Sequence, residues 1–182
     1  MNFEAVFRLL VEKFEKEKIR FALIGGFALN AAGFSRATGD IDFLAAKEDM
    51  LKVKAFLLSI GYELAYETED VSTFISRLGE LGRVDFLHAH RKYSLTMLSR
   101  AVERQILDGK VKLKVIIPED LIGLKVQSSS NDPSRQFQDF ADIGNVLKAN
   151  REKLDMGLVR EYFGLFGKEK ELEDILGKID AN

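Results

Sequence analysis

The sequence predicts a protein of the α/β (α+β) class. We expect a small mixed sheet covered by helices, followed by a mostly helical C-terminal part. Three observations support this class. Short apolar or alternating runs typical of strands are separated by amphipathic helical segments. A strand, a glycine turn, a helix and a second strand follow one another near the start. Helical periodicity dominates the last third of the 182 residues. We therefore expect a core over residues 1–117 and a helical part over 118–182, packed on the core.

Composition limits the possible functions. The chain has no cysteine, which excludes disulfides, thiolate metal sites and a cysteine nucleophile. The 27 Lys and Arg nearly balance the 29 Asp and Glu, so net charge offers no general attraction to nucleic acid. No apolar stretch has the length of a membrane span or the pattern of a secretory leader. These features predict a soluble, cytoplasmic protein that does not enter a membrane.

The first elements are a covering helix, a buried strand and a glycine turn. Apolar residues recur at helical spacing between Phe3 and Phe14, so this segment is predicted to cover the core. The apolar run from Phe21 to Ile24 predicts a strand that ends in Gly25-Gly26, and we expect the next helix to begin at or just after Phe27. Backbone N–H groups at a helix start favour an anion, and glycine lets a phosphate approach closely.

Two aspartates follow on the next predicted strand. The alternation in Asp40-Ile41-Asp42-Phe43 places both carboxylates on one face and the apolar side chains on the other. Carboxylates are the hard oxygen ligands that Mg²⁺ prefers to share with substrate phosphates. Taken alone, a Gly-Gly pair is often only a turn and an Asp-x-Asp pair only a solvated face. Together they predict a site for a nucleoside triphosphate and its metal.

This segment resembles the polymerase-beta-type nucleotidyltransferase superfamily, whose signature is a Gly-Gly or Gly-Ser turn followed by Asp-x-Asp. Many members carry Ser after the first glycine, whereas this chain has Gly26 and then Phe27, so backbone amides would have to bind the phosphate alone. The string Arg-x-Thr-x-Asp-Ile-Asp resembles one subgroup. By this resemblance Arg36 would contact the triphosphate, although it could equally pair with a surface carboxylate.

The middle of the chain supplies a third carboxylate. A helix over residues 47–60 precedes three predicted strands, Tyr62 to Glu67, Thr73 to Leu78, and Arg83 to Ala89. Asp85 lies within the last strand, where burial is costly unless the carboxylate is paired or binds metal. The resemblance implies that Asp85 completes the metal site. A salt bridge to Arg83 or Arg77 is the alternative. The two histidines, His88 and His90, lack a third nitrogen or sulfur ligand and predict no metal site.

The remaining sequence predicts a hairpin and then helices. Asp108-Gly109 separates two alternating runs and is typical of a hairpin turn. Pro118 opens a helix that continues from Leu121 to about Gln127, before a polar loop over residues 128–133. The predicted apolar face of the following helix consists of Phe137, Phe140, Ala141, Gly144 and Leu147. Two further helices are expected over about residues 154–166 and 169–178.

This half resembles nucleotidyltransferases related to abortive-infection toxins and to aminoglycoside nucleotidyltransferases. The carrying string is Pro-Glu-Asp-Leu-Ile-x-Leu-Lys, followed by an Arg and Asp-x-x-Asp-Ile. By this resemblance Lys125 would contact phosphate, and Asp139 or Asp142 would orient it. The family often has Lys before the first of these acids, where this chain has Gln138. An exposed lysine and solvated helix acids are the alternative interpretation.

The predicted function is Mg²⁺-dependent transfer of a nucleoside monophosphate from a nucleoside triphosphate to a hydroxyl or phosphate. Asp40, Asp42 and Asp85 would hold two metal ions, spaced about 3.5 to 4 Å in such sites, and Gly25 and Gly26 the β and γ phosphates. Without a long basic, aromatic track, we expect a small-molecule or protein acceptor ahead of tRNA. The alternative is a non-catalytic antitoxin or regulatory protein of the same fold, acting on a toxin-antitoxin partner.

Overall fold

The computed structural model describes residues 2–77 and 81–181, and the chain divides into two compact units. The first unit comprises Met1–Ala31 and Arg36–Ile116, and the second comprises Ala32–Ser35 and Ile117–Asn182. Within the described ranges, no helix combines the length and the apolar character needed to cross a membrane.

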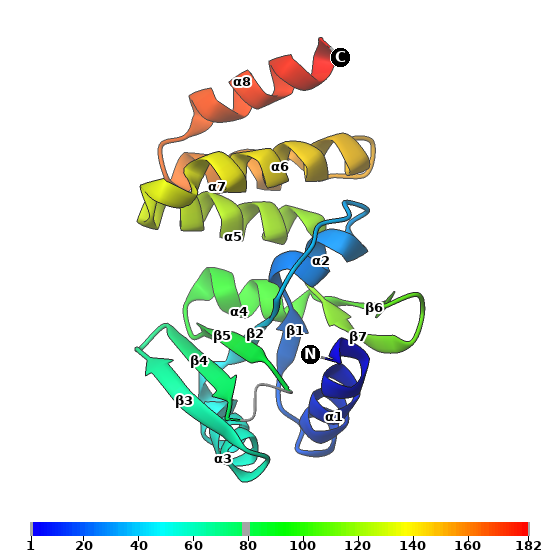
Figure 1. Cartoon of the computed structure of the whole chain (residues 1–182). Helices are drawn as coiled ribbons and strands as arrows, with labels where there is room; N and C mark the ends of the chain where they lie inside the picture. The colour runs from blue at the N-terminus through cyan, green and yellow to red at the C-terminus, as the bar shows by residue number, and fades with distance from the viewer. Residues whose placement is uncertain (1, 78–80, 182) are drawn as a thin grey trace. The chain divides into compact units, whose positions relative to one another are not determined.

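A seven-stranded mixed sheet forms the centre of the first unit (Figure 1). Its strands are β1 Phe21–Leu23, β2 Asp40–Ala46, β3 Tyr62–Glu67, β4 Val71–Ser76, β5 Arg83–Ala89, β6 Val102–Ile106 and β7 Val111–Val115. Their order across the sheet is β3-β4-β5-β2-β1-β7-β6. The pairs β2 with β5 and β1 with β7 are parallel, and the other pairs are antiparallel. The predicted mixed sheet is therefore confirmed.

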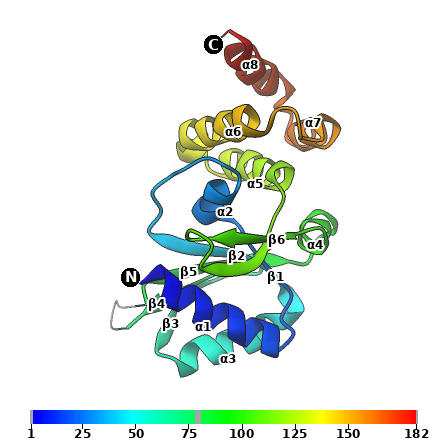
Figure 2. The same cartoon turned by 90° about the vertical axis from the view of Figure 1, so that its right-hand side faces the viewer.

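Helices cover both faces of this sheet. They are α1 Phe3–Lys16, α2 Gly25–Ala31, the 3₁₀ helix η1 Lys47–Asp49, α3 Met50–Ser59 and α4 Lys92–Ser99. Figure 2 views the sheet nearly edge-on, with α1 and α3 on one face and α2 and α4 on the other. The central strand β1 is buried throughout, whereas the edge strands β3 and β6 are largely exposed.

Aromatic side chains fill the core beneath α1. Phe7 and Phe14 of α1 contact Phe43 of β2 with ring centroids 6.1 and 5.8 Å apart, and Phe43 stacks on Phe86 of β5 at 5.7 Å. All four rings are almost fully buried. Because side chains alternate along a strand, the residues preceding Phe43 and Phe86 point to the opposite face of the sheet. Those residues are Asp42 and Asp85.

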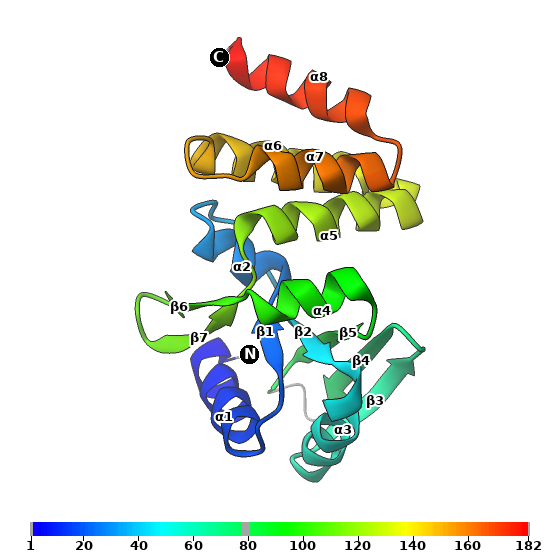
Figure 3. The same cartoon turned by 180° about the vertical axis from the view of Figure 1, so that it is seen from behind.

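The second unit is helical. Its helices are α5 Pro118–Asn131, the 3₁₀ helix η2 Pro133–Arg135, α6 Gln136–Asn150, α7 Met156–Leu165 and α8 Glu169–Asp180. Helices α6 and α7 both pack against α5, and α8 packs on α6 and α7 (Figure 3). Tyr162 joins α7 to α5: its hydroxyl donates a 2.6 Å hydrogen bond to Asp120, and its ring lies against Gly123, where a Cβ would come within 2.8 Å.

Several element boundaries differ from those predicted. Helix α2 begins at Gly25 rather than near Phe27, because Gly25 itself makes the turn at φ +66°. Strand β4 ends at Ser76, and the predicted final residue, Leu78, lies outside the described residues. The predicted loop over 128–133 is helical through Asn131. Helix α4 follows the third predicted strand and was not predicted, since its few apolar residues give a weak helical pattern.

The predicted apolar face of α6 is correct at Leu147 and wrong at Phe137 and Ala141. Phe137 is 91% exposed, whereas Asp139 and Asp142 are buried, together with Ile143, Val146 and Leu147. Burying a carboxylate requires a partner, and the periodicity of apolar residues contains no information about partners on other helices.

Candidate active site

The acidic residues of the first unit meet on one face of the sheet, at the ends of β2 and β5 where both strands begin. The parallel register places Asp42 directly opposite Asp85, and Asp40 directly opposite Arg83. We call these four residues the acidic face. Three carboxylates and one guanidinium therefore lie on adjacent strands, on the side away from the aromatic core.

The glycine turn lies directly against this face. Strand β1 runs antiparallel to β2, and the N–H of Ile24 donates a 2.9 Å hydrogen bond to the backbone oxygen of Asp42. A Cβ at Gly25 would lie 2.0 Å from Oδ2 of Asp42, so no other residue fits there without displacing the carboxylate. The backbone of Gly26 lowers the pKa of the Asp42 carboxyl, against the stronger influences that raise it. The predicted phosphate turn and the predicted metal ligand are thus in contact.

Thr38 fixes the other side of the turn. A Cβ at Gly26 would lie 2.6 Å from the Cβ of Thr38, and the Thr38 hydroxyl donates a 3.1 Å hydrogen bond to the backbone oxygen of Asp40. The segment that leads into β2 therefore packs on the start of α2. Gly26 faces Thr38, just before β2, and Gly25 faces Asp42 within β2. The glycine turn therefore packs closely on the start of this strand.

Two donors hold the Asp85 carboxylate. Thr73, which lies opposite Asp85 on β4, donates its hydroxyl to Oδ1 at 2.5 Å. Arg83 donates from Nε to Oδ2 at 2.7 Å. Both oxygens of Asp85 are therefore engaged by protein donors, one neutral and one cationic. The pairing with Arg83 that the sequence left open exists in the structure.

The position of Asp42 disfavours its charged form. Burial raises the pKa of its carboxyl to about 6, and repulsion from Asp85 and Asp40 adds to the effect, against attraction by Arg83. Within the acidic face, one guanidinium thus lies beside three carboxylates, so negative groups outnumber positive ones. A group of this kind favours the arrival of a cation.

The donor set fits a hard divalent cation chemically. Its oxygens are carboxylates on rigid strands, and the excess negative charge would be relieved by a metal. In the described part of the chain, no group of three or more His, Cys, Asp or Glu side chains is already arranged as a metal site. The Arg83 guanidinium already donates a hydrogen bond to Oδ2 of Asp85 and so competes with a metal for that oxygen.

Lys125 and Asp139 come together in the second unit, on α5 and α6. The Lys125 ammonium lies 2.9 Å from Oδ1 of Asp139 and 2.7 Å from Oδ2 of Asp142, and all three side chains are buried. Gln138 donates a 3.0 Å hydrogen bond to the other oxygen of Asp142. Oδ2 of Asp139 accepts no hydrogen bond within the described residues and lies 3.6 Å from Nε of Arg135. We call Lys125, Asp139 and Asp142 the buried cluster.

The other polar candidates lie at separate places. The backbone N–H of Arg36 donates to Asn30 at 2.8 Å, and the role of its side chain toward triphosphate stays a prediction. His88 is buried between the Ser72 hydroxyl and the backbone oxygen of Glu69, at 3.0 Å from each. His90 pairs with Asp70 at 2.7 Å. Each histidine thus has its own protein partners.

Sequence reasoning missed Thr73 and Thr38 and treated Arg83 only as an ion-pair partner. Thr73 and Arg83 owe their places to the register of β4 and β5, and register cannot be read from one strand's sequence. The position of Arg83 two residues before Asp85 did contain a usable signal, because residues i and i+2 of a strand share a face.

Comparison with solved structures finds the same fold in proteins of low sequence identity. The crystal structure of ANT(2'')-Ia in complex with adenylyl-2''-tobramycin has a TM-score of 0.67 at 11% identity, over 91% of this chain and 99% of that one. The lincosamide antibiotic adenylyltransferase LnuA, bound to lincomycin, gives 0.53 at 16%, over 80% and 96%. An antigenic nucleotidyltransferase-like protein from Paracoccidioides brasiliensis gives 0.57 at 16%, over 96% and 91%.

A comparison with curated proteins gives no match. A family model described as "Nucleotidyl transferase of unknown function (DUF2204)" matches residues 2–181. This match spans nearly the whole chain and both units, and it agrees with the superfamily resemblance of the glycine turn and the aspartates. The chain therefore belongs to this nucleotidyltransferase family.

Proposed function

We propose that the chain transfers a nucleoside monophosphate from a nucleoside triphosphate to a hydroxyl or phosphate acceptor, with two Mg²⁺ ions bound at the acidic face. The observation that carries this proposal is the register of β2 and β5, which sets Asp42 opposite Asp85 beside a glycine turn in contact with Asp42. Such a reaction needs anionic oxygens for metal next to backbone that a phosphate can approach.

Asp40, Asp42 and Asp85 would hold the metal ions. Bound there, the metals would neutralise charge on the triphosphate and lower the pKa of the attacking hydroxyl. The Gly25-Gly26 turn offers backbone without side chains for the β and γ phosphates. Asp85 would ligate the catalytic metal and help to deprotonate the acceptor, while the Thr73 hydroxyl keeps Oδ1 and fixes the carboxylate plane.

Lys125 and Arg36 are the proposed cationic contacts to phosphate. Asp139 supports this role for Lys125, because its carboxylate holds the ammonium at 2.9 Å and so restricts where the lysine can point. Asp142 restricts it further.

A small molecule is the proposed acceptor class, ahead of a protein or tRNA. Lys and Arg nearly balance Asp and Glu, so the chain has little general attraction for a polyanion. Two proteins of the same fold are named for or bound to small antibiotics, tobramycin in adenylylated form and lincomycin. The fold therefore can serve such acceptors, and we extend that use to this chain.

The test is transfer of label. The protein is incubated with each α-³²P-labelled nucleoside triphosphate and Mg²⁺, with aminoglycosides, lincosamides, total tRNA or a cell lysate as acceptor. We expect Asp42→Asn to abolish labelling of any acceptor, because it removes one anionic metal ligand. Asp108→Asn, an exposed change in the β6–β7 turn, is the matched control and should label like the wild type.

Label on tRNA in preference to small molecules would overturn the acceptor class but not the reaction. No transfer to any acceptor, with nucleotide still bound, would contradict the enzymatic proposal and favour a nucleotidyltransferase-fold protein that acts by binding.

A further inference from the structure

Arg83 is the one cation on the acidic face. It lies directly opposite Asp40 across the β2–β5 pair, and its Nε bonds Oδ2 of Asp85 at 2.7 Å. Its side chain is 48% exposed, whereas the Asp85 side chain is 21% exposed. The guanidinium can therefore leave the carboxylate without disturbing packed residues.

The two donors on Asp85 differ in what a metal would require of them. The Thr73 hydroxyl is neutral, half-buried and attached to a neighbouring strand, so it can keep Oδ1 while the other oxygen binds elsewhere. The Arg83 guanidinium is a full positive charge on the oxygen that a metal would need. A divalent cation and a guanidinium beside one carboxylate oxygen repel each other, so a metal at Oδ2 weakens the hold of Asp85 on Arg83.

We propose that Arg83 is an internal cation that occupies Asp85 in the metal-free protein and is displaced when metal and triphosphate bind together. This inference rests on the proposed function, since it assumes that the acidic face binds a divalent cation. It adds a role that the three aspartates alone do not supply, namely coupling between the binding of metal and the binding of triphosphate.

The coupling follows from what Arg83 gains or loses. Metal alone displaces the guanidinium from Asp85 and brings no new anionic partner for it. Metal that arrives with a triphosphate brings phosphate oxygens to the same end of β5, and a guanidinium pairs well with phosphate in a planar fork. Each ligand then makes the other bind more tightly, and the linkage is reciprocal. Free metal is disfavoured, and the metal–nucleotide complex is favoured.

The experiment measures Mn²⁺ affinity by titration calorimetry, with and without a non-hydrolysable α,β-methylene triphosphate. We expect Arg83→Gln to bind Mn²⁺ alone roughly threefold to tenfold more tightly than wild type, since a partly exposed ion pair no longer competes. In the presence of the analogue, Arg83→Gln and wild type should bind Mn²⁺ about equally tightly. The analogue should therefore increase Mn²⁺ affinity less in Arg83→Gln than in wild type. Arg83→Lys retains the charge, and its affinity for Mn²⁺ alone should lie between those of wild type and Arg83→Gln.

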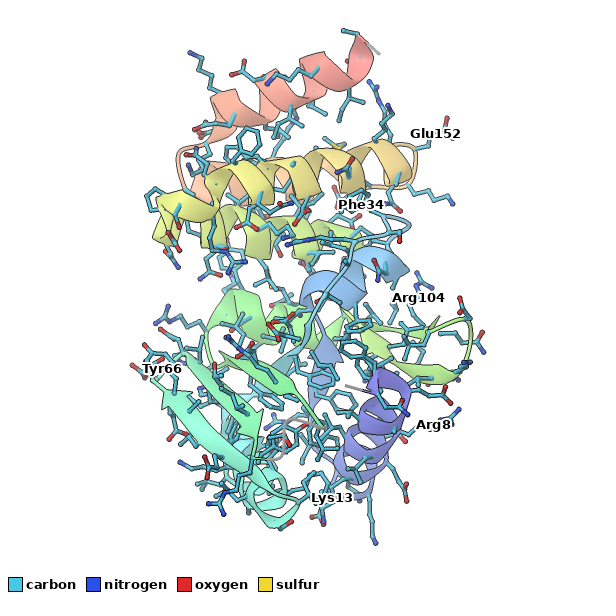
Figure 4. All side chains as sticks on the ribbon, viewed as in Figure 1. Arg8, Lys13, Phe34, Tyr66, Arg104 and Glu152 are labelled. Atoms are coloured by element: carbon cyan, nitrogen blue, oxygen red, sulfur yellow. The ribbon has the colours of Figure 1, made fainter. Side chains whose placement is uncertain are left out.

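Arg8→Gln is the matched control. Arg8 pairs with Glu4 on α1, its side chain is 58% exposed, and it points outward on the opposite side of the sheet from the acidic face (Figure 4). Its loss removes the same charge from the same unit, so it should leave both Mn²⁺ affinities unchanged. A change in this variant equal to that of Arg83→Gln would reduce the effect to net charge and overturn the proposal.

Asp42→Asn distinguishes failure of the metal site from failure of the proposed role of Arg83. If wild type binds Mn²⁺ and Asp42→Asn does not, the metal site exists. Unchanged or weaker Mn²⁺ binding by Arg83→Gln then overturns the role of Arg83 alone. If wild type binds no Mn²⁺ under either condition, the metal part of the proposed function and the Arg83 proposal both fail.

Discussion

The acidic face and the buried cluster are built from the same kinds of residue and reach opposite electrostatic outcomes. In the buried cluster, one ammonium lies within 3 Å of two carboxylates, and all three groups are almost completely buried. On the acidic face, three half-buried carboxylates share one half-exposed guanidinium, and the pKa of Asp42 is raised to about 6.

The difference distinguishes charge that is balanced within the protein from charge left in excess. A buried ion pair is matched from within the protein, because little water reaches it. Carboxylates at the start of strands can remain under-compensated, because solvent and ligands reach them. The buried cluster should therefore contribute to stability, whereas the acidic face should reduce stability and favour binding of a cation. Mutations in each group can test this difference.

The largest expected effect is on the buried cluster. Lys125→Met leaves Asp139 and Asp142 without their cation, and we expect the free energy of unfolding to fall by about 3–5 kcal/mol. Urea denaturation followed by circular dichroism measures it. Adding Asp139→Asn and Asp142→Asn to this variant should restore much of the loss. A triple variant no more stable than Lys125→Met would mean that the lysine stabilises through packing instead.

The second effect has the opposite sign. The pKa of Asp42 is raised from 3.8 to about 6 in the folded protein, so the folded state holds a proton that the unfolded state releases between these pH values. Stability without metal should therefore fall as pH rises from about 4 to about 6, by up to about 3 kcal/mol. Asp42→Asn should remove this fall and be the more stable protein at pH 7 in EDTA.

Asp142→Asn supplies the contrast for that measurement. It removes one of the two carboxylates that hold Lys125 and should destabilise the protein at pH 7, by about 1–3 kcal/mol. If Asp42→Asn and Asp142→Asn both destabilise the protein at neutral pH, the acidic face is a structural ion network like the buried cluster, and the distinction between them is lost.

A smaller effect concerns the turn that touches the acidic face. Gly25 and Gly109 both have positive φ, +66° and +84°, but a Cβ would meet Asp42 at 2.0 Å in the first case and only the end of Gln105 at 3.7 Å in the second. Gly109→Ala thus measures the cost of backbone strain alone. We expect Gly25→Ala to cost about 1–3 kcal/mol more, because the carboxylate must move. Equal losses in thermal denaturation would contradict the close contact.

The sequence predicted the local part of this site and little of its cross-strand part. Periodicity placed Asp40 and Asp42 on one face, and the glycine pair predicted the turn, because both depend on neighbouring residues. The strand containing Asp85 was predicted with its observed bounds. Its alignment with Asp42 depends on pairing between strands that are distant in the chain, which local patterns do not specify.

The second unit shows the same limit. Helix α6 was predicted, but its buried face was not, because the pattern favoured Phe137 over Asp139. The partner that permits burial of Asp139 is Lys125, on a different helix. Apolar periodicity is thus a reliable guide where a helix buries hydrocarbon and fails where it buries a matched ion pair.

The most direct test of the central claim is metal-dependent nucleotide binding at the acidic face. Titration calorimetry with a non-hydrolysable ATP analogue compares wild type, Asp42→Asn and the control Asp108→Asn, each in Mg²⁺ and in EDTA. The account predicts that wild type and Asp108→Asn bind the analogue only with Mg²⁺ and that Asp42→Asn does not bind it, although it remains folded. Equal affinity in Asp42→Asn, or wild-type binding that EDTA leaves unchanged, would contradict the account.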